Sequence, residues 1–127
     1  MPEKEDCACR SAPKLIFACS GAADVGRVSD MAARTMTKDG VGSMFCLAGV
    51  GGRVSKIMDR TKAASRILAI DGCSLGCAKQ CLEFAGFKEF GYGRLDLLGM
   101  EKGETAVNPA NIAKVSAEGS RILDSSE

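Results

Sequence analysis

The chain alternates short apolar runs with longer segments in which apolar residues recur at helical spacing. The apolar runs of strand length are residues 14–19, 44–47 and 66–70. The first helical face consists of Val25, Val28, Met31, Ala32 and Met36. A second helical face follows at residues 54–58, and residues 74–85 have the pattern of a third helix that stops at Gly86. The pattern therefore predicts strands that alternate with helices.

The last third of the chain has a weaker pattern. We expect a final strand either near Phe90 or at residues 95–98. Asn108-Pro109 is a typical helix start, because Asn caps a helix well and Pro fits its first position. Residues 104–127 are therefore expected to form a C-terminal helix or a tail, although Gly119 weakens the helical pattern.

Alternating strands and helices predict an α/β fold. We expect a three-layer sandwich with a mainly parallel sheet of about four strands and helices on both faces. A flavodoxin-like or Rossmann-like order would place the first strand between the second and the third. The length of 127 residues suits one domain, which we assign to residues 12–103 without an internal boundary. Residues 1–11 are polar and are expected to form a flexible tail.

Composition and charge argue against several classes of partner. The formal net charge is +1, with both signs spread along the chain, and aromatic residues make up 5%. A nucleic-acid or membrane-surface role driven by charge, or base stacking on aromatic rings, is therefore not expected. The chain shows neither a membrane-spanning apolar stretch nor the basic-then-apolar order of a signal peptide. We expect a cytoplasmic protein whose thiols stay reduced.

The cysteine content points to metal or redox chemistry. The chain has seven Cys, an odd number that suits a full disulfide framework poorly. It has no His, which excludes catalytic groups and zinc sites that require an imidazole. A metal ion would therefore be held by sulfur, with carboxylates as the other charged ligands.

Four cysteines are placed to meet at one edge of the predicted sheet. Cys19, Cys46 and Cys73 each lie at or just beyond the end of a predicted strand, and 27 residues separate each from the next. The carboxyl ends of parallel strands share one edge, where open α/β sheets bind ligands. Cys77 follows Cys73 by four residues, one turn of the helix expected from residue 74. We therefore expect Cys19, Cys46, Cys73 and Cys77 to hold one metal ion, zinc by preference, in a structural, sensing or carrier role.

Other uses of these cysteines remain open. Cys73 and Cys77 could cycle between a dithiol and a disulfide, and the same four thiolates could hold an iron–sulfur cluster. Whether the protein is an enzyme depends on an open coordination position, which the sequence does not reveal. Cys81 is interpreted as a core residue, and Cys7 and Cys9 as part of the tail. Protein partners and oligomeric state are not predicted.

Two further motifs have simpler interpretations. Residues 49–52 are rich in glycine, but Val54 stands where a dinucleotide-binding motif needs its last glycine. Nucleotide binding is therefore not expected. Asp71 precedes Gly72 at the end of the third strand, and we expect its carboxylate to cap or orient the following helix.

The motifs together resemble the DGC domain family, which is named for the Asp-Gly-Cys sequence found here at residues 71–73. The resemblance covers roughly residues 14–103 and includes Cys19-Ser20-Gly21, Phe45-Cys46-Leu47-Ala48-Gly49 and Ile70-Asp71-Gly72-Cys73-Ser74-Leu75-Gly76-Cys77. It implies zinc binding through four cysteines, which correspond here to Cys19, Cys46, Cys73 and Cys77. Nothing carries over to Cys7, Cys9 or the segment after residue 103.

Overall fold

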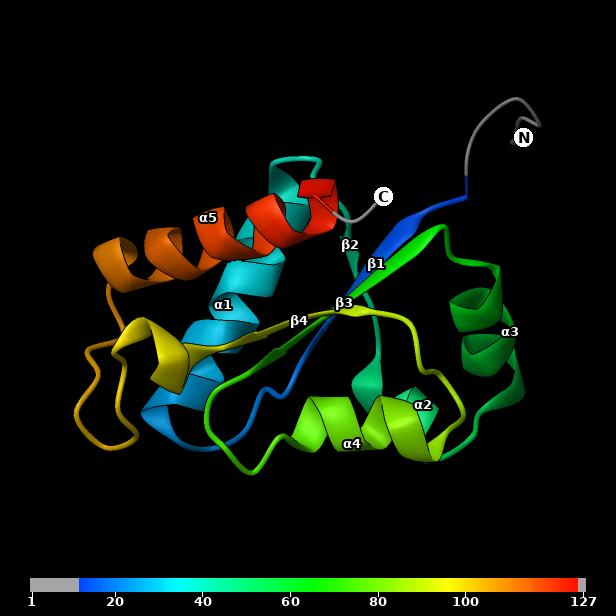
Figure 1. Ribbon diagram of the computed structural model, residues 1–127, viewed down its shortest axis with the longest axis horizontal. Coiled ribbons are helices and arrows are strands. Elements are labelled where there is room, and N and C mark those ends of the chain that lie inside the picture. The colour runs from blue at the N-terminus through cyan, green and yellow to red at the C-terminus, as the bar shows by residue number, and fades with distance from the viewer. Residues whose placement is uncertain (1–11, 126–127) are drawn as a thin grey trace.

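The structure, a computed structural model, describes residues 12–125 of the chain. Strands and helices alternate along most of its length. In chain order the elements are β1 (Lys14–Ala18), α1 (Asp24–Lys38), β2 (Ser43–Met44), α2 (Leu47–Gly51), α3 (Ser55–Ala63), β3 (Arg66–Asp71), α4 (Cys77–Phe84), β4 (Gly91–Arg94), the 3-10 helix η1 (Leu95–Leu98) and α5 (Pro109–Ser125) (Figure 1).

The strands form one parallel sheet in the order β2-β1-β3-β4. The predicted parallel α/β fold is confirmed, including the position of the first strand between the second and third. Ile16 pairs with Met44 of β2, and Ala18 pairs with Ile70 of β3, so the carboxyl ends of these three strands lie side by side. The residues that follow each strand therefore emerge at a common edge.

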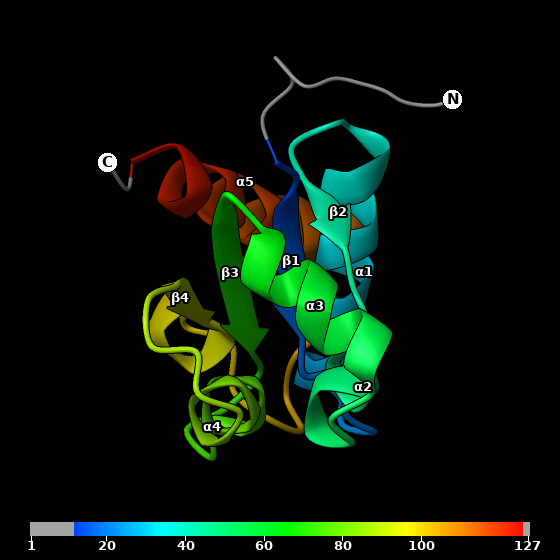
Figure 2. The same ribbon diagram turned by 90° about the vertical axis from the view of Figure 1, so that its right-hand side faces the viewer.

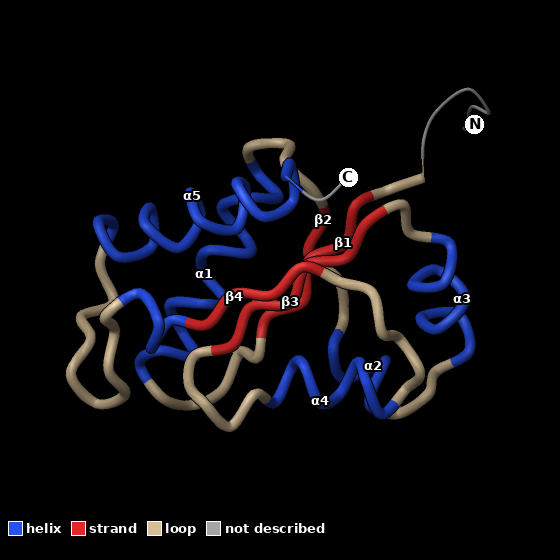
Figure 3. The backbone as a smooth tube through the Cα atoms, viewed as in Figure 1, coloured by secondary structure: helices blue, strands red, loops and turns tan. Residues whose placement is uncertain are grey.

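Helices cover both faces of the sheet, as Figures 1 and 3 show. Ile16 and Ala18 of β1 face α1 and α5, whereas Leu15 and Phe17 face α2, α3 and α4. This split follows from the alternation of side chains along a strand. The buried apolar core residues contributed by the α-helices are Val25, Val28, Ala32, Ala33, Met36, Val115 and Leu123 on the first face and Val50, Ala78 and Leu82 on the second.

The C-terminal helix belongs to the same packed unit. Asn108 accepts a hydrogen bond from the backbone N–H of Asn111 at 2.8 Å, which confirms the predicted helix start. Val115 and Leu123 of α5 are buried in the core shared with α1. Gly119 lies where α5 approaches α1, since an added Cβ would stand 2.9 Å from the Met36 sulfur. None of the helices in residues 12–125 has the length and apolar character that crossing a membrane requires.

Two expected boundaries are wrong, and the last strand follows one of its two expected positions, the one near Phe90. The second strand ends at Met44, because Cys46 caps a short helix that starts at Leu47. Helix α4 begins at Cys77 instead of Ser74, because Gly76 adopts a left-handed conformation with φ 65° and the preceding residues form a turn. Residues 95–98 form a 3-10 helix, and the last strand is Gly91–Arg94.

Candidate functional site

A pocket of about 790 Å³ lies at the carboxyl edge of the sheet, beside the ends of β1 and β2. Figure 2 shows α2 and α4 next to each other at this edge, and the two helices are in contact. Ligand sites in open α/β sheets are expected at this edge. The residues that line the pocket are Ala18, Cys19, Ser20, Asp30, Arg34, Met44, Phe45, Cys46, Leu47, Ala48, Gly51, Cys77 and Cys81.

Three of the four predicted ligands line this pocket. Cys19 follows β1, Cys46 follows β2 and Cys77 begins α4, so the fold brings together residues that are far apart in the sequence. Cys73 is not part of the lining. It is partly buried in the turn before α4, where its carbonyl accepts a hydrogen bond from the Gly76 N–H at 3.2 Å. Because α4 starts only at Cys77, the two cysteines are not one helical turn apart as the sequence suggested.

Two of the pocket thiols lie at helix starts. Cys46 is the N-cap residue of α2, and its sulfur accepts a hydrogen bond from the backbone N–H of Gly49 at 3.3 Å. Cys77 is the first residue of α4 and is exposed. Backbone N–H groups and the helix dipole favour negative charge at such positions.

The loop after β1 is held in a specific conformation. Ser20 has φ 52°, a left-handed value that is uncommon for a residue with a side chain. The Cys19 N–H donates to the Ile70 carbonyl at 3.0 Å, and the Cys19 sulfur lies 3.4 Å from the Ser29 hydroxyl. Gly26 in the first turn of α1 packs so closely that an added Cβ would stand 2.5 Å from the Gly21 carbonyl oxygen. These contacts fix the position of Cys19 at the pocket.

Asp71 anchors the start of α4, as the sequence predicted. Its side chain is 1% exposed and accepts hydrogen bonds from the N–H groups of Ala78 at 2.7 Å and Lys79 at 3.0 Å. The Tyr92 hydroxyl donates to the same carboxylate at 2.8 Å. Burial, together with this hydrogen bond to Asp71, raises the pKa of Tyr92. The carboxylate is occupied by these three donors and orients the helix that carries Cys77.

Cys81 lines the pocket although the sequence assigned it to the core. Its sulfur donates a long hydrogen bond of 3.8 Å to the Leu47 carbonyl, and its side chain also packs against the apolar core beside α2. Burial raises the pKa of the Cys81 thiol, which favours the protonated form. The spacing of four residues from Cys77 is the sequence signal that places it on the same helical face.

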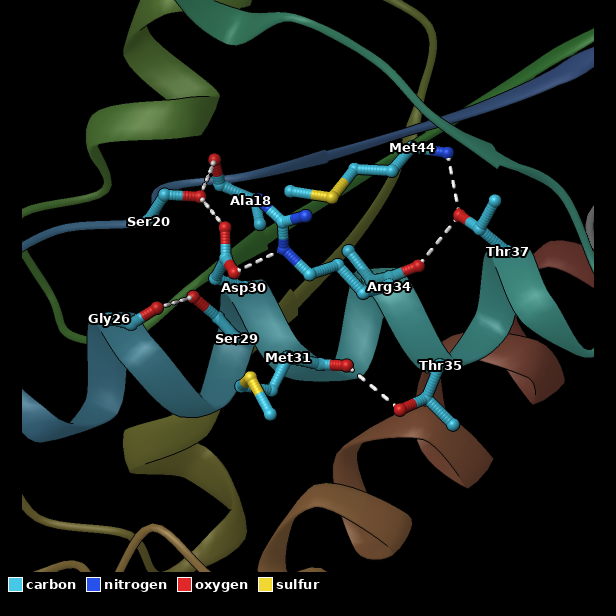
Figure 4. A network of polar contacts seen from close by, with 11 residues as sticks. Ala18, Ser20, Gly26, Ser29, Asp30, Met31, Arg34, Thr35, Thr37 and Met44 are labelled. Carbon is cyan, nitrogen blue, oxygen red and sulfur yellow. Dashed lines mark hydrogen bonds and ion pairs between the residues drawn. The ribbon is translucent and has the colours of Figure 1, made fainter.

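The pocket wall also contains a charged group that the sequence did not reveal. Arg34 of α1 donates from Nε to Asp30 Oδ2 at 2.7 Å, and the Ser20 hydroxyl donates to Asp30 Oδ1 at 2.8 Å (Figure 4). Burial would raise the pKa of Asp30, but the hydrogen bonds from Arg34 and Ser20 outweigh it and lower that pKa. The spacing of Asp30 and Arg34 predicts the ion pair, but only the fold places it beside the cysteines.

The donor atoms suit a soft or borderline metal ion, but they are not assembled. In residues 12–125, no group of three or more Cys, Asp or Glu side chains is arranged to hold a metal ion as the side chains stand. The pocket nevertheless gathers the sulfurs of Cys19, Cys46, Cys77 and Cys81 along one surface. Metal binding at this edge therefore requires the thiols to converge from their present positions.

The chain is similar to known proteins over most of its length. A protein of Pseudomonas aeruginosa, the anaerobic and virulence modulator AnvM, is 40% identical over 68 residues, which are 54% of this chain. The aligned part covers 52% of that relative, so the chain spans about half the relative's length. No solved structure matches the chain. Residues 15–118 match the DGC domain, so the chain belongs to the DGC domain family.

Proposed function

We propose that this protein binds one metal ion, zinc by preference, through the thiolates of Cys19, Cys46, Cys73 and Cys77. The observation that supports the proposal best is that Cys19, Cys46 and Cys77 follow or begin three different elements and yet line one pocket. Thiolates are good ligands for zinc, and a site with no His must rely on them.

Backbone amides near the pocket would help to carry the negative charge of such a site. Four thiolates around a divalent ion leave a net charge of −2, which nearby N–H donors stabilise. The Gly49 N–H already points at the Cys46 sulfur, and Cys77 lies at the positive end of the α4 dipole. Both features would offset part of the negative charge of such a site.

The fourth ligand in this proposal is Cys73, and Cys81 is the competing candidate. Cys73 lies in the turn directly before Cys77, and its place in the Asp-Gly-Cys motif supports the assignment. Cys81 lines the pocket, but its side chain also packs against the apolar core beside α2. We therefore assign Cys81 to packing against α2.

The role that we propose for the metal is structural, sensing or carrying. Asp71 is the carboxylate of the motif that contains Cys73 and Cys77, and it accepts three hydrogen bonds and caps α4. These contacts favour a structural role for its side chain over acid–base catalysis. A reducing compartment such as the cytoplasm would keep the thiols available.

Single Cys→Ser variants of the full chain test the ligand assignment. Zinc content and affinity would be measured by competition with a chromophoric chelator under anaerobic conditions. We expect Cys19→Ser, Cys46→Ser, Cys73→Ser and Cys77→Ser each to weaken zinc binding by about tenfold or more, whereas Cys81→Ser leaves it unchanged.

The matched pair Cys73→Ser and Cys81→Ser decides the fourth ligand. If zinc affinity fell in Cys81→Ser but not in Cys73→Ser, Cys81 would be the fourth metal ligand in place of Cys73. Unchanged affinity in Cys46→Ser, which removes a thiol that lines the pocket, would refute the site itself.

A further inference from the structure

The pocket is much larger than a metal ion requires. Its volume of about 790 Å³ lies in the range of pockets that hold small organic molecules. Apolar side chains make up much of the wall, and besides the thiols its polar side chains are Ser20, Asp30 and Arg34. An apolar wall with a few polar groups is typical of a site that binds and orients a small molecule.

Arg34 has unused hydrogen-bond donors in this wall. Only its Nε bonds to Asp30, and neither terminal nitrogen makes a hydrogen bond within residues 12–125. Arg94 and Arg121 differ, because each holds its carboxylate partner with both Nε and Nη2. As far as the described part of the chain is concerned, the terminal N–H groups of Arg34 are therefore available for another acceptor.

The guanidinium of Arg34 is also positioned in advance. Asp30 bonds to both Arg34 and the Ser20 hydroxyl, so a chain of hydrogen bonds ties the guanidinium to the loop that carries Cys19. Figure 4 shows the guanidinium between Asp30 and Met44, close to the end of β1 at Ala18. A charged group held in this way loses less conformational freedom when it binds a ligand.

We propose that the pocket binds a small organic carboxylate, with the carboxylate on the terminal nitrogens of Arg34 and the apolar body along Met44, Phe45 and Leu47. The planar fork of a guanidinium matches the two oxygens of a carboxylate. The negative charge of Asp30 beside Arg34 disfavours a dianion such as phosphate, because Arg34 is the only cationic side chain that lines the pocket within residues 12–125. This inference concerns an organic ligand and goes beyond the proposed metal site.

The probes are straight-chain carboxylates from butyrate to octanoate, titrated into the full chain and followed by backbone-amide NMR. We expect saturable shifts of residues around the pocket, such as Ser20 and Ala48. Affinity should rise by up to about fourfold for each added methylene, because each buries more apolar surface. Straight-chain alcohols of equal length serve as the neutral control.

Two arginine variants separate a specific site from general attraction to positive charge. Arg34→Gln should weaken octanoate binding by about tenfold or more, since a charged hydrogen-bond partner is lost. Arg121→Gln is the matched control, because the side chains of Arg34 and Arg121 are 66% and 64% exposed and both pair with a carboxylate on their own helix. Arg34→Lys, which keeps the charge but lacks the fork, should bind with intermediate affinity.

Several results would overturn the inference. The first is that Arg34→Gln binds octanoate as tightly as the unaltered protein does, and the second is that alcohols bind as tightly as carboxylates. The inference would also be wrong if the NMR shifts lay away from the pocket or if no saturable binding were observed. Zinc content is measured on the same samples, and Arg34→Gln should retain it. Failure of the carboxylate site can thus be told apart from failure of the metal site.

Discussion

At the scale of single residues, Asp71 shows how one side chain can position a functional cysteine. Its carboxylate is buried, and its three hydrogen-bond partners are two N–H groups of α4 and the Tyr92 hydroxyl. An acidic side chain this far inside a protein is stable only because all these donors point at it. Asp71, the first residue of the Asp-Gly-Cys motif, thus orients the helix that starts at Cys77.

Asp71→Asn should destabilise the protein by about 2 kcal/mol, because an amide cannot accept from both helix N–H groups and from Tyr92. Urea unfolding followed by circular dichroism gives the free energy of unfolding. Asp59→Asn is the control, since Asp59 is exposed on α3 and should change stability by no more than about 0.5 kcal/mol. Equal effects of the two substitutions would refute the role of Asp71.

Tyr92 should make stability depend on alkaline pH. Burial and the hydrogen bond to Asp71 raise its pKa in the folded protein, whereas the unfolded chain titrates near the ordinary value of 10.0. Stabilisation by the protonated phenol is therefore complete below about pH 10 and is lost as the pH rises above it, by up to about 1.4 kcal/mol per pH unit.

This pH effect can be isolated because the chain has a single tyrosine. Urea unfolding from pH 9 to 11, compared between the unaltered protein and Tyr92→Phe, should show a steeper decline of stability in the unaltered protein. Near-ultraviolet absorbance reports the phenolate of the folded protein directly. Parallel pH profiles for the two proteins would contradict the assignment.

At the scale of elements, the contact between α1 and the loop after β1 determines where Cys19 lies. An added Cβ at Gly26 would overlap the backbone of Gly21, at 2.5 Å from its oxygen and 2.7 Å from its nitrogen. A backbone segment cannot move aside as cheaply as the end of a side chain. The start of α1 and the loop that carries Cys19 and Ser20 are therefore packed as one unit.

Gly26→Ala should destabilise the protein by about 1–3 kcal/mol, although alanine is the better helix former. Thermal or urea unfolding measures the loss, and zinc binding should weaken because the Cys19 loop is displaced. Gly21→Ala is the matched control, since nothing lies within 4 Å of a Cβ at that position. If Gly26→Ala were as stable as Gly21→Ala, the close packing described here would be wrong.

The element boundaries show which features the sequence could not reveal. Hydrophobic spacing predicted α1, and the Asn108-Pro109 pair predicted the start of α5, because both features depend on local residues. The start of α4 was expected three residues too early, since the true start depends on the Asp71 carboxylate of β3, which accepts from N–H groups of α4, and on the conformation of Gly76. Cys73 was therefore expected on a helix and lies instead in a turn.

At the scale of the whole molecule, the order of the strands brings distant cysteines together. Placing β1 between β2 and β3 puts the residues after three strands at one edge, and this could be inferred from the strand–helix alternation. The sequence could not show that Cys81 lines the same pocket or that Arg34 and Asp30 form its charged wall. Those placements depend on the packing of α1, α2 and α4 around the edge.

The central claim is that the cysteines at this edge hold a metal ion, and one measurement tests it most directly. The full chain would be purified anaerobically without chelator and submitted to elemental analysis together with a visible absorption spectrum. The account predicts about one zinc per chain and a colourless protein. A coloured protein containing iron and inorganic sulfide would replace zinc with an iron–sulfur cluster. Metal-free protein that takes up no zinc when zinc is supplied would contradict the account.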